Sequence, residues 1–223
     1  MKKLILSSLF SAGLLFSAPN FVSAQTVASA AKTAKSTKTA KIAATIYKVD
    51  PTQSNVAWDG KKVTGAHNGT IKVANGAIQL DKNKVVGGTI EMDMNSIVNL
   101  DLKDQEYNQK LIGHLKSEDF FSVEKHPRAT FKITSATPVK GAKAGEPNYN
   151  VAGNLTIKGI TNPITFPATI TANGNSVVAK SEAVTLDRTK WDIRYGSKSF
   201  FANIGDKAIM DDFTVQFNVV ANK

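Results

Sequence analysis

The chain has 223 residues, which is long enough to bury a sizeable core, and a formal net charge of +10. It has no cysteine, which excludes disulfides, thiolate metal sites and a cysteine nucleophile. Six lysines and no acid precede residue 46, so that stretch supplies +6 of the charge and leaves only +4 for the rest. Because the body of the protein is only mildly basic, we expect no nucleic acid among its partners.

Residues 1–24 have the pattern of a secretory signal peptide. Two lysines start it, an apolar run from Leu4 to Ala18 follows, and residues 22–24 (Val-Ser-Ala) offer a small-x-small cleavage site. The run is too short for a membrane-spanning helix, and no later stretch is long enough. We therefore expect export to the periplasm, with secretion as the alternative, and a soluble mature protein.

Residues 25–45 consist almost entirely of Ala, Thr, Ser and Lys, with little to bury. Such a composition does not offset the entropy cost of ordering, so the segment is predicted to be a flexible linker. The alternative interpretation is a polybasic arm that makes peripheral contact with an anionic envelope surface.

From residue 46 to the C-terminus, apolar and polar residues alternate as in β-strands with one buried face. The clearest examples are residues 85–94 and 213–219. Pro51 predicts that the first strand is either interrupted or starts at a sheet edge. Asn75-Gly76 and Asn173-Gly174 both predict hairpin turns, and Gly87-Gly88 is interpreted as a strand bulge.

One helix is predicted, over residues 104–116, with Tyr107, Leu111 and Leu115 on its packed face. About eight strands remain, mostly joined by short turns, which favours an antiparallel meander. An even set of two-faced strands fits an eight-stranded antiparallel up-and-down β-barrel, which leaves no exposed edges. The predicted class is therefore all-β with one inserted helix, as a single domain over residues 46–223.

Five segments of the chain together resemble the YceI-like family of exported, lipocalin-like lipid-binding proteins. They are YKVDPTQSNVAW (47–58), VTGAHNGTIKV (63–73), GHLKSEDFFSVEKHPRATFKI (113–133), YNVAGNLTIKGITNPITF (149–166) and LDRTKWDIRYGS (186–197). The resemblance implies a lipocalin-like barrel whose apolar tunnel holds an isoprenoid lipid, either a polyprenyl chain or a quinone tail, as ligand and no other cofactor. The chain departs from many family members at Gln53, Leu111 and Ile112, positions near which those members place polar residues, so the resemblance implies tail binding more directly than head-group recognition.

The apolar strand faces allow two interpretations. An eight-stranded barrel is either filled by its own side chains or hollow enough to hold one ligand, and alternation alone does not decide between them. The resemblance favours a tunnel wall for most of these residues. The predicted wall comprises Ile90, Met92, Met94, Phe120, Phe121, Phe131, Ile133, Leu155, Ile157, Ile164, Phe166, Phe213, Val215, Phe217 and Val219.

Two cations and two aromatic residues follow the strand that ends near residue 186: Arg188, Trp191, Arg194 and Tyr195. We interpret them as a cation–π latch that closes one barrel end, with contact to a lipid head group as the alternative. Elsewhere, the histidines at 67, 114 and 126 lack metal-binding spacing, and no GxSxG elbow is present. No catalytic residue and no metal site is therefore predicted.

The leading hypothesis is an exported carrier or sequestering protein for an isoprenoid lipid, which is not an enzyme. A second hypothesis is an enzyme that acts on an isoprenoid or another apolar substrate. A third is an envelope interaction protein whose barrel is packed solid and whose basic arm does the work. The sequence leaves open whether the protein is a monomer or a homodimer.

Overall fold

A computed structural model describes residues 44–223, so the predicted signal peptide and nearly all of the predicted linker lie outside the described residues. The first strand begins at Thr45, at the end of the predicted linker. In chain order the strands are β1 (Thr45–Val49), β2 (Asn55–Lys62), β3 (Gly65–Asp81), β4 (Lys84–Asn99), β5 (Arg128–Pro138), β6 (Tyr149–Ile157), β7 (Ile160–Ala172), β8 (Ser176–Ser181), β9 (Val184–Asp187) and β10 (Ile209–Asn222). Two 3-10 turns, η1 (Arg188–Trp191) and η2 (Gly205–Lys207), lie between β9 and β10.

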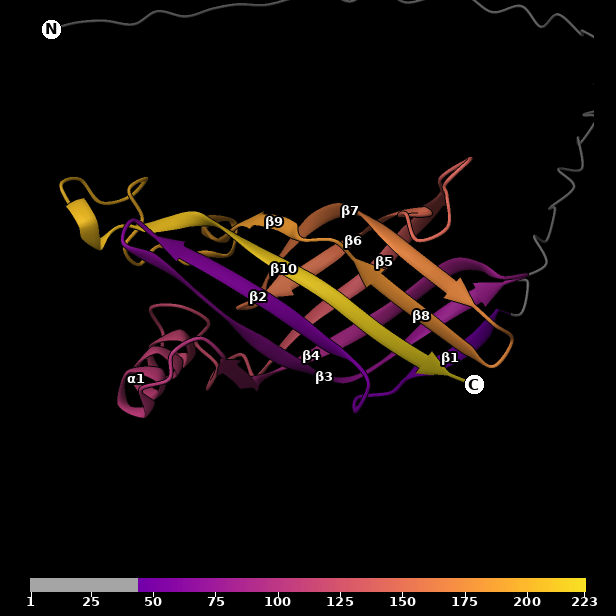
Figure 1. The fold of residues 1–223 in the computed structure, drawn as a ribbon, viewed down its shortest axis with the longest axis horizontal. Helices are drawn as coiled ribbons and strands as arrows, with labels where there is room; N and C mark the ends of the chain where they lie inside the picture. The colour runs from indigo at the N-terminus through magenta and orange to yellow at the C-terminus, as the bar shows by residue number, and fades with distance from the viewer. Residues whose placement is uncertain (1–43) are drawn as a thin grey trace, which may run out of the picture. The chain divides into compact units, whose positions relative to one another are not determined.

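The strands form a closed antiparallel ring (Figure 1). From β2 to β8 each strand pairs with the next one along the chain, and β10 closes the ring by pairing with both β2 and β8. The short strands β1 and β9 also pair with β10. We therefore describe β1 and β2 as the two halves of one interrupted strand, and β8 and β9 as the two halves of another. Eight strand positions result, which confirms the predicted up-and-down barrel.

Breaks and irregularities in the strands follow local sequence. The first strand is interrupted around Pro51, one of the two predicted alternatives, because proline cannot donate to the ladder. The register shifts between β3 and β4 beside Gly87, which confirms the predicted bulge there. The predicted turn at Asn173-Gly174 is present, and Gly174 has the positive φ of 84° that glycine adopts freely.

The hairpin predicted at Asn75-Gly76 is wrong, because β3 runs straight through this dipeptide. The register shifts there instead, so the Asn-Gly pair marks a bulge inside one long strand. A Cβ atom on Gly76 would lie 2.5 Å from the Thr89 carbonyl oxygen, so the close approach of β4 requires glycine. The actual turn lies at Lys82 and Asn83, both with positive φ.

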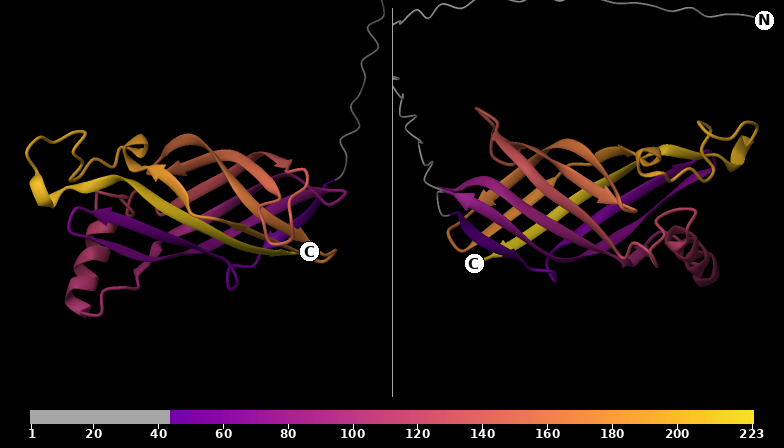
Figure 2. Two further views of the ribbon diagram at one scale, coloured as in Figure 1. Left: turned by 45° about the horizontal axis from the view of Figure 1, so that its top comes forward. Right: turned by 180° about the vertical axis from the view of Figure 1, so that it is seen from behind.

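Helix α1 (Gln105–Lys116) lies outside the ring, beside one end of the barrel (Figures 1 and 2). The Asp104 carboxylate caps its start by accepting the backbone N–H groups of residues 106 and 107. Leu111, Ile112 and Leu115 are half-buried against the barrel. Tyr107 was expected on this face but is 63% exposed. The packed face of the helix is therefore formed by Leu111, Ile112 and Leu115 without Tyr107.

The core is the inside of the ring, since the alternate residues of each strand point there. In β10, for example, Val215, Phe217, Val219 and Ala221 are buried and Gln216 is exposed. No helix within residues 44–223 is long and apolar enough to span a membrane.

Candidate ligand-binding cavity

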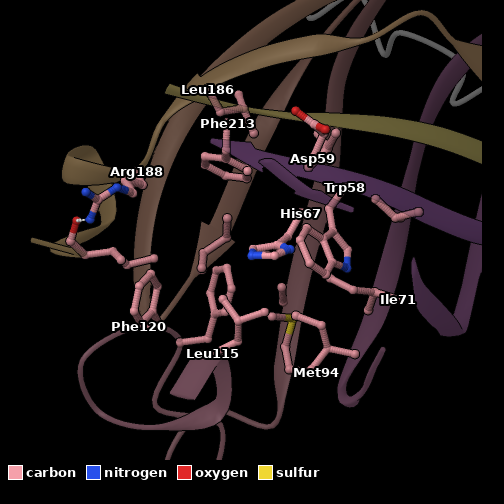
Figure 3. A pocket seen from close by; sticks show the side chains of 18 of the residues that line it. Trp58, Asp59, His67, Ile71, Met94, Leu115, Phe120, Leu186, Arg188 and Phe213 are labelled. Atoms are coloured by element: carbon pink, nitrogen blue, oxygen red, sulfur yellow. Dashed lines mark hydrogen bonds between the residues drawn. The ribbon is translucent and has the colours of Figure 1, made fainter. Parts of the chain in front are cut away.

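The barrel encloses a cavity of about 270 Å³ near the end where α1 lies (Figure 3). A volume of this size lies just below the usual range of small-molecule sites, which run from about 300 to 1,000 Å³. Its wall is mostly apolar and comes from β2, β3, β4, β5, β6, β9 and β10, together with α1 and the segments that follow α1 and β9.

Nine of the fifteen residues predicted for the tunnel wall line this cavity. They are Met92, Met94, Phe120, Phe121, Leu155, Ile157, Phe213, Val215 and Phe217. The two methionines suit such a wall, because an unbranched, polarisable side chain adapts to an irregular ligand.

A second cavity of about 50 Å³ lies further along the same interior. Phe217 lines both cavities. Five more of the predicted wall residues line the smaller one: Ile90, Phe131, Ile133, Phe166 and Val219. Ile164 lines neither cavity and is half-buried against the core. The interior is thus hollow in one half and nearly filled in the other.

Three phenylalanines mark the boundary between the two halves. The rings of Phe131, Phe166 and Phe217 come from β5, β7 and β10, and their centroids lie 5.3–5.9 Å apart. Offset aromatic contacts at these separations are favourable. Gly153 of β6 makes room for them, since a Cβ atom there would lie 2.5 Å from the Phe131 ring. This phenylalanine cluster lies where the larger cavity meets the smaller one.

The other end of the larger cavity opens to solvent. Met210 belongs to its lining and is 51% exposed. Lys61, Lys62 and Asp212 also belong to the lining and are exposed. A ligand that enters here would pass from this mixed polar and apolar mouth to a dry apolar wall.

Two imidazoles, those of His67 and His114, lie in this mostly apolar wall. His67 of β3 lines the cavity, and its Nδ1 lies 2.8 Å from Oδ2 of Asp101. The second carboxylate oxygen, Oδ1, accepts the backbone N–H of Asn68 and the side-chain amide of Asn99. Asn99 in turn is bonded to Asn108 of α1, so the network joins β3, β4 and the helix.

The environment of Asp101 keeps its carboxyl group ionised. Desolvation alone would raise its pKa, but hydrogen bonds from the Asn68 backbone, the His67 ring and the Asn99 amide outweigh it and lower the pKa to about 2. An acceptor that stays negatively charged orients the ring of its histidine partner.

A sequence profile of the YceI-like domain matches residues 47–221, nearly all of the described barrel. The chain belongs to the YceI-like family. Among curated relatives, a UPF0312 protein of Yersinia enterocolitica is 37% identical over 79 residues, which is 35% of this chain and 38% of the relative. A UPF0312 protein of Pectobacterium carotovorum is 44% identical over 62 residues, 28% of this chain and 29% of the relative. The chain thus spans about a third of the length of the curated relatives it matches.

Two solved structures have the same fold as this YceI-like chain. BcnA of Burkholderia cenocepacia is 25% identical with a TM-score of 0.59, and the match covers 78% of this chain and 99% of BcnA. A polyisoprenoid-binding domain from Saccharophagus degradans has a TM-score of 0.55, with 79% of this chain and 97% of that domain covered. At 14% identity, the second likeness shows the fold alone.

The predicted cation–π latch of this YceI-like barrel is wrong for Arg188. Its guanidinium is buried and donates to three carbonyl oxygens: Nε to Met210 at 2.9 Å, Nη1 to Ile193 at 2.8 Å and Nη2 to Ile209 at 3.0 Å. Burial lowers the pKa of this guanidinium, opposed by the nearby carboxylates of Asp211 and Asp187. Arg188 therefore ties the segment after β9 to β10 through backbone carbonyls, and its Nη2 also lies 3.3 Å from Oδ1 of Asp211.

The other three residues of that group separate in space. Trp191 is buried and donates its Nε1–H to the Leu155 carbonyl at 3.1 Å. Arg194 stacks over Phe200, 4.6 Å from the ring centroid, and pairs with an aspartate two residues before it. Tyr195 packs against His114 and Phe120 with centroids 4.6 and 5.6 Å away. The group stabilises this barrel end by packing and backbone hydrogen bonds, with one cation–π contact to a residue outside the predicted set.

Sequence reasoning missed several wall residues and the polar pair. Four missed residues line the larger cavity: Trp58, Ile71, Ile97 and Leu115. The alternation within the strands and the apolar stripe of the helix were the signals that could have indicated them. His67 was considered only for metal-binding spacing, and its partner Asp101 lies 34 residues away, beyond any local motif. Among residues 44–223, no group of three His, Cys, Asp or Glu side chains is placed to hold a metal ion.

Proposed function

We propose that this protein binds the tail of an isoprenoid lipid in the larger cavity, as an exported carrier or sequestering protein rather than an enzyme. The observation that supports this most directly is the cavity itself: an apolar space of about 270 Å³ that opens at one barrel end. Membership of the YceI-like family, with a polyisoprenoid-binding domain among the proteins of the same fold, supports the ligand class.

The chemistry of the wall suits a prenyl chain. Branched and flexible apolar side chains contact the cavity, and burial of a hydrocarbon chain contributes about 0.8 kcal/mol per CH₂ before association costs. Affinity is then expected to rise with the number of isoprene units until the tail meets the phenylalanine cluster. The pattern of residues 1–24 supports export and a periplasmic or secreted location for this binding.

Gly60 offers a direct test of the cavity as the binding site. It lies on β2 at the mouth, and a Cβ atom added there would meet no atom within 4 Å. Gly60→Leu therefore fills the entrance without disturbing packed neighbours, and we expect it to weaken geranylgeraniol binding at least tenfold while the thermal midpoint stays within a few degrees. Gly113→Leu on the open face of α1 is the matched control, since a Cβ atom there also meets nothing within 4 Å.

Calorimetric titration of the delipidated protein with farnesol and geranylgeraniol measures both effects. The proposal requires tighter binding of the longer alcohol and selective loss in Gly60→Leu. Equal binding by wild type, Gly60→Leu and Gly113→Leu would place the ligand elsewhere. Lipid recovered by organic extraction from the protein of its own host would then identify the natural ligand.

A further inference from the structure

Most polar side-chain groups at the cavity already have partners or lie in solvent. Arg188 donates to three backbone carbonyls, and Nε2 of His114 is 3.1 Å from an Asp119 oxygen. Lys61 and Lys62 are exposed at the mouth. His67 differs, because its Nε2 has no hydrogen-bond partner within residues 44–223 while its ring lines the cavity.

The partner of His67 determines what its free nitrogen can do. A carboxylate oxygen only accepts hydrogen bonds, so the Nδ1 atom that faces Asp101 carries the proton. In the neutral imidazole, Nε2 is then left with a lone pair and acts as an acceptor. Asp101 is itself fixed by the Asn68 backbone and the Asn99 amide, so the ring is held in one orientation.

The neighbours of His67 leave room for a ligand group. On the facing strand β2 its direct partner is Gly60, which has no side chain, and open space lies where a Cβ atom would be. Trp58 is the diagonal neighbour on the same face, and the two side chains lie beside each other in Figure 3. The Trp58 Nε1–H is buried and has no hydrogen-bond partner among the described residues, so a second polar group here is also unused.

We propose that His67, positioned by Asp101, binds the head of the ligand by accepting a hydrogen bond from a hydroxyl group at Nε2. The inference rests on the proposed function and extends it. The tail would point away from the mouth toward Met92 and Phe217, and the hydroxyl would lie at His67. The ligand class is an isoprenoid alcohol, phenol or quinol, whose O–H donates; an ether or a quinone carbonyl offers only acceptors and leaves Nε2 unpaired.

Two ligands with the same tail test the proposal on the unmodified protein. Geranylgeraniol and its methyl ether share one tail, but the ether carries O–CH₃ in place of the O–H donor. Calorimetric titration therefore compares the two ligands in wild type and in His67→Phe, which lacks the acceptor and controls for the added methyl group. Wild type is expected to bind the alcohol fivefold to tenfold more tightly, equivalent to about 1–1.4 kcal/mol. His67→Phe should bind both ligands with similar affinity, near that of wild type for the ether. Asp101→Asn should reduce the preference, since an amide no longer fixes one tautomer.

The outcomes separate this inference from the function on which it rests. If wild type binds the alcohol and the ether equally well, the head-group assignment is overturned and tail binding stands. If wild type binds neither, the proposed function fails, and the assignment fails with it. If His67→Phe does not fold, the wild-type comparison of the two ligands still decides. A preference that persists unchanged in a folded His67→Phe would also overturn the role of His67.

Discussion

The two halves of the barrel interior share strands, alternation and residue types, yet one is hollow and the other is nearly filled. Along β4, Ile90 lines the cavity of about 50 Å³, and Met92, two residues on and equally buried, lines the cavity of about 270 Å³. Along β10 the change occurs at Phe217, which borders both. Alternation therefore predicts which side chains point into the barrel. Whether an inward side chain packs in the core or lines the cavity depends on where the three phenylalanines from β5, β7 and β10 come into contact.

The largest expected effect comes from a charge at the boundary between the halves. Phe217→Asp would place an unpaired carboxylate among Phe131, Phe166 and the dry wall, and we expect a loss of more than about 4 kcal/mol in the free energy of unfolding. Gln216→Asp is the control on the exposed face and should change stability by no more than about 0.5 kcal/mol. Urea denaturation measures both, and equal losses would contradict the assignment of faces.

A second change should join the two halves. Phe166→Ala removes one ring of the phenylalanine cluster, and truncation of a buried phenylalanine costs about 3–5 kcal/mol. In the folded fraction, the merged space should shift binding toward longer isoprenoid alcohols relative to farnesol. Ile164→Ala, on the same strand but lining neither cavity, is the matched control. An unchanged chain-length preference in Phe166→Ala would show that the cluster does not limit ligand depth.

The comparison along β4 gives a third, smaller difference. Ile90→Ala opens a void in the filled half and should cost about 2–4 kcal/mol, because the surroundings relax only partly. Met92→Ala widens a space that already exists, so we expect a loss of about 1 kcal/mol without ligand and a clear loss in isoprenoid affinity. Denaturation of the delipidated variants, with lipid titration alongside, checks this. Equal stability losses with unchanged affinity in Met92→Ala would make Met92 a core residue.

Much of the fold followed from local pattern, and the failures have physical causes. Alternation indicated the strands, and the four-residue spacing of Tyr107, Leu111 and Leu115 indicated the helix. The hairpin prediction at Asn75-Gly76 failed because the same dipeptide occurs in turns and in bulges. Here β4 passes so close to Gly76 that the dipeptide forms a bulge. Arg188 misled because a cation near aromatic residues was expected to stack, whereas three carbonyls of the barrel end surround it. His67 and Asp101 meet because β3 and β4 pair with Gly69 opposite Asn99, a register that no local motif encodes.

The smallest expected effect concerns the polar network of the hollow half. The Asp101 pKa is about 2 in the folded protein against an ordinary 3.8, so its ionised form stabilises the fold above about pH 4. That contribution should disappear as the pH falls from about 4 to 2, with a loss of about 1–2 kcal/mol after allowance for partial exposure to solvent. Asp101→Asn removes the titrating group, so the difference in unfolding free energy between wild type and this variant should shrink over that interval.

Since other carboxylates titrate equally in both proteins, the difference isolates Asp101. A difference that stays constant from pH 5 to 2 would show that the Asp101–His67 network adds no stability through its charge.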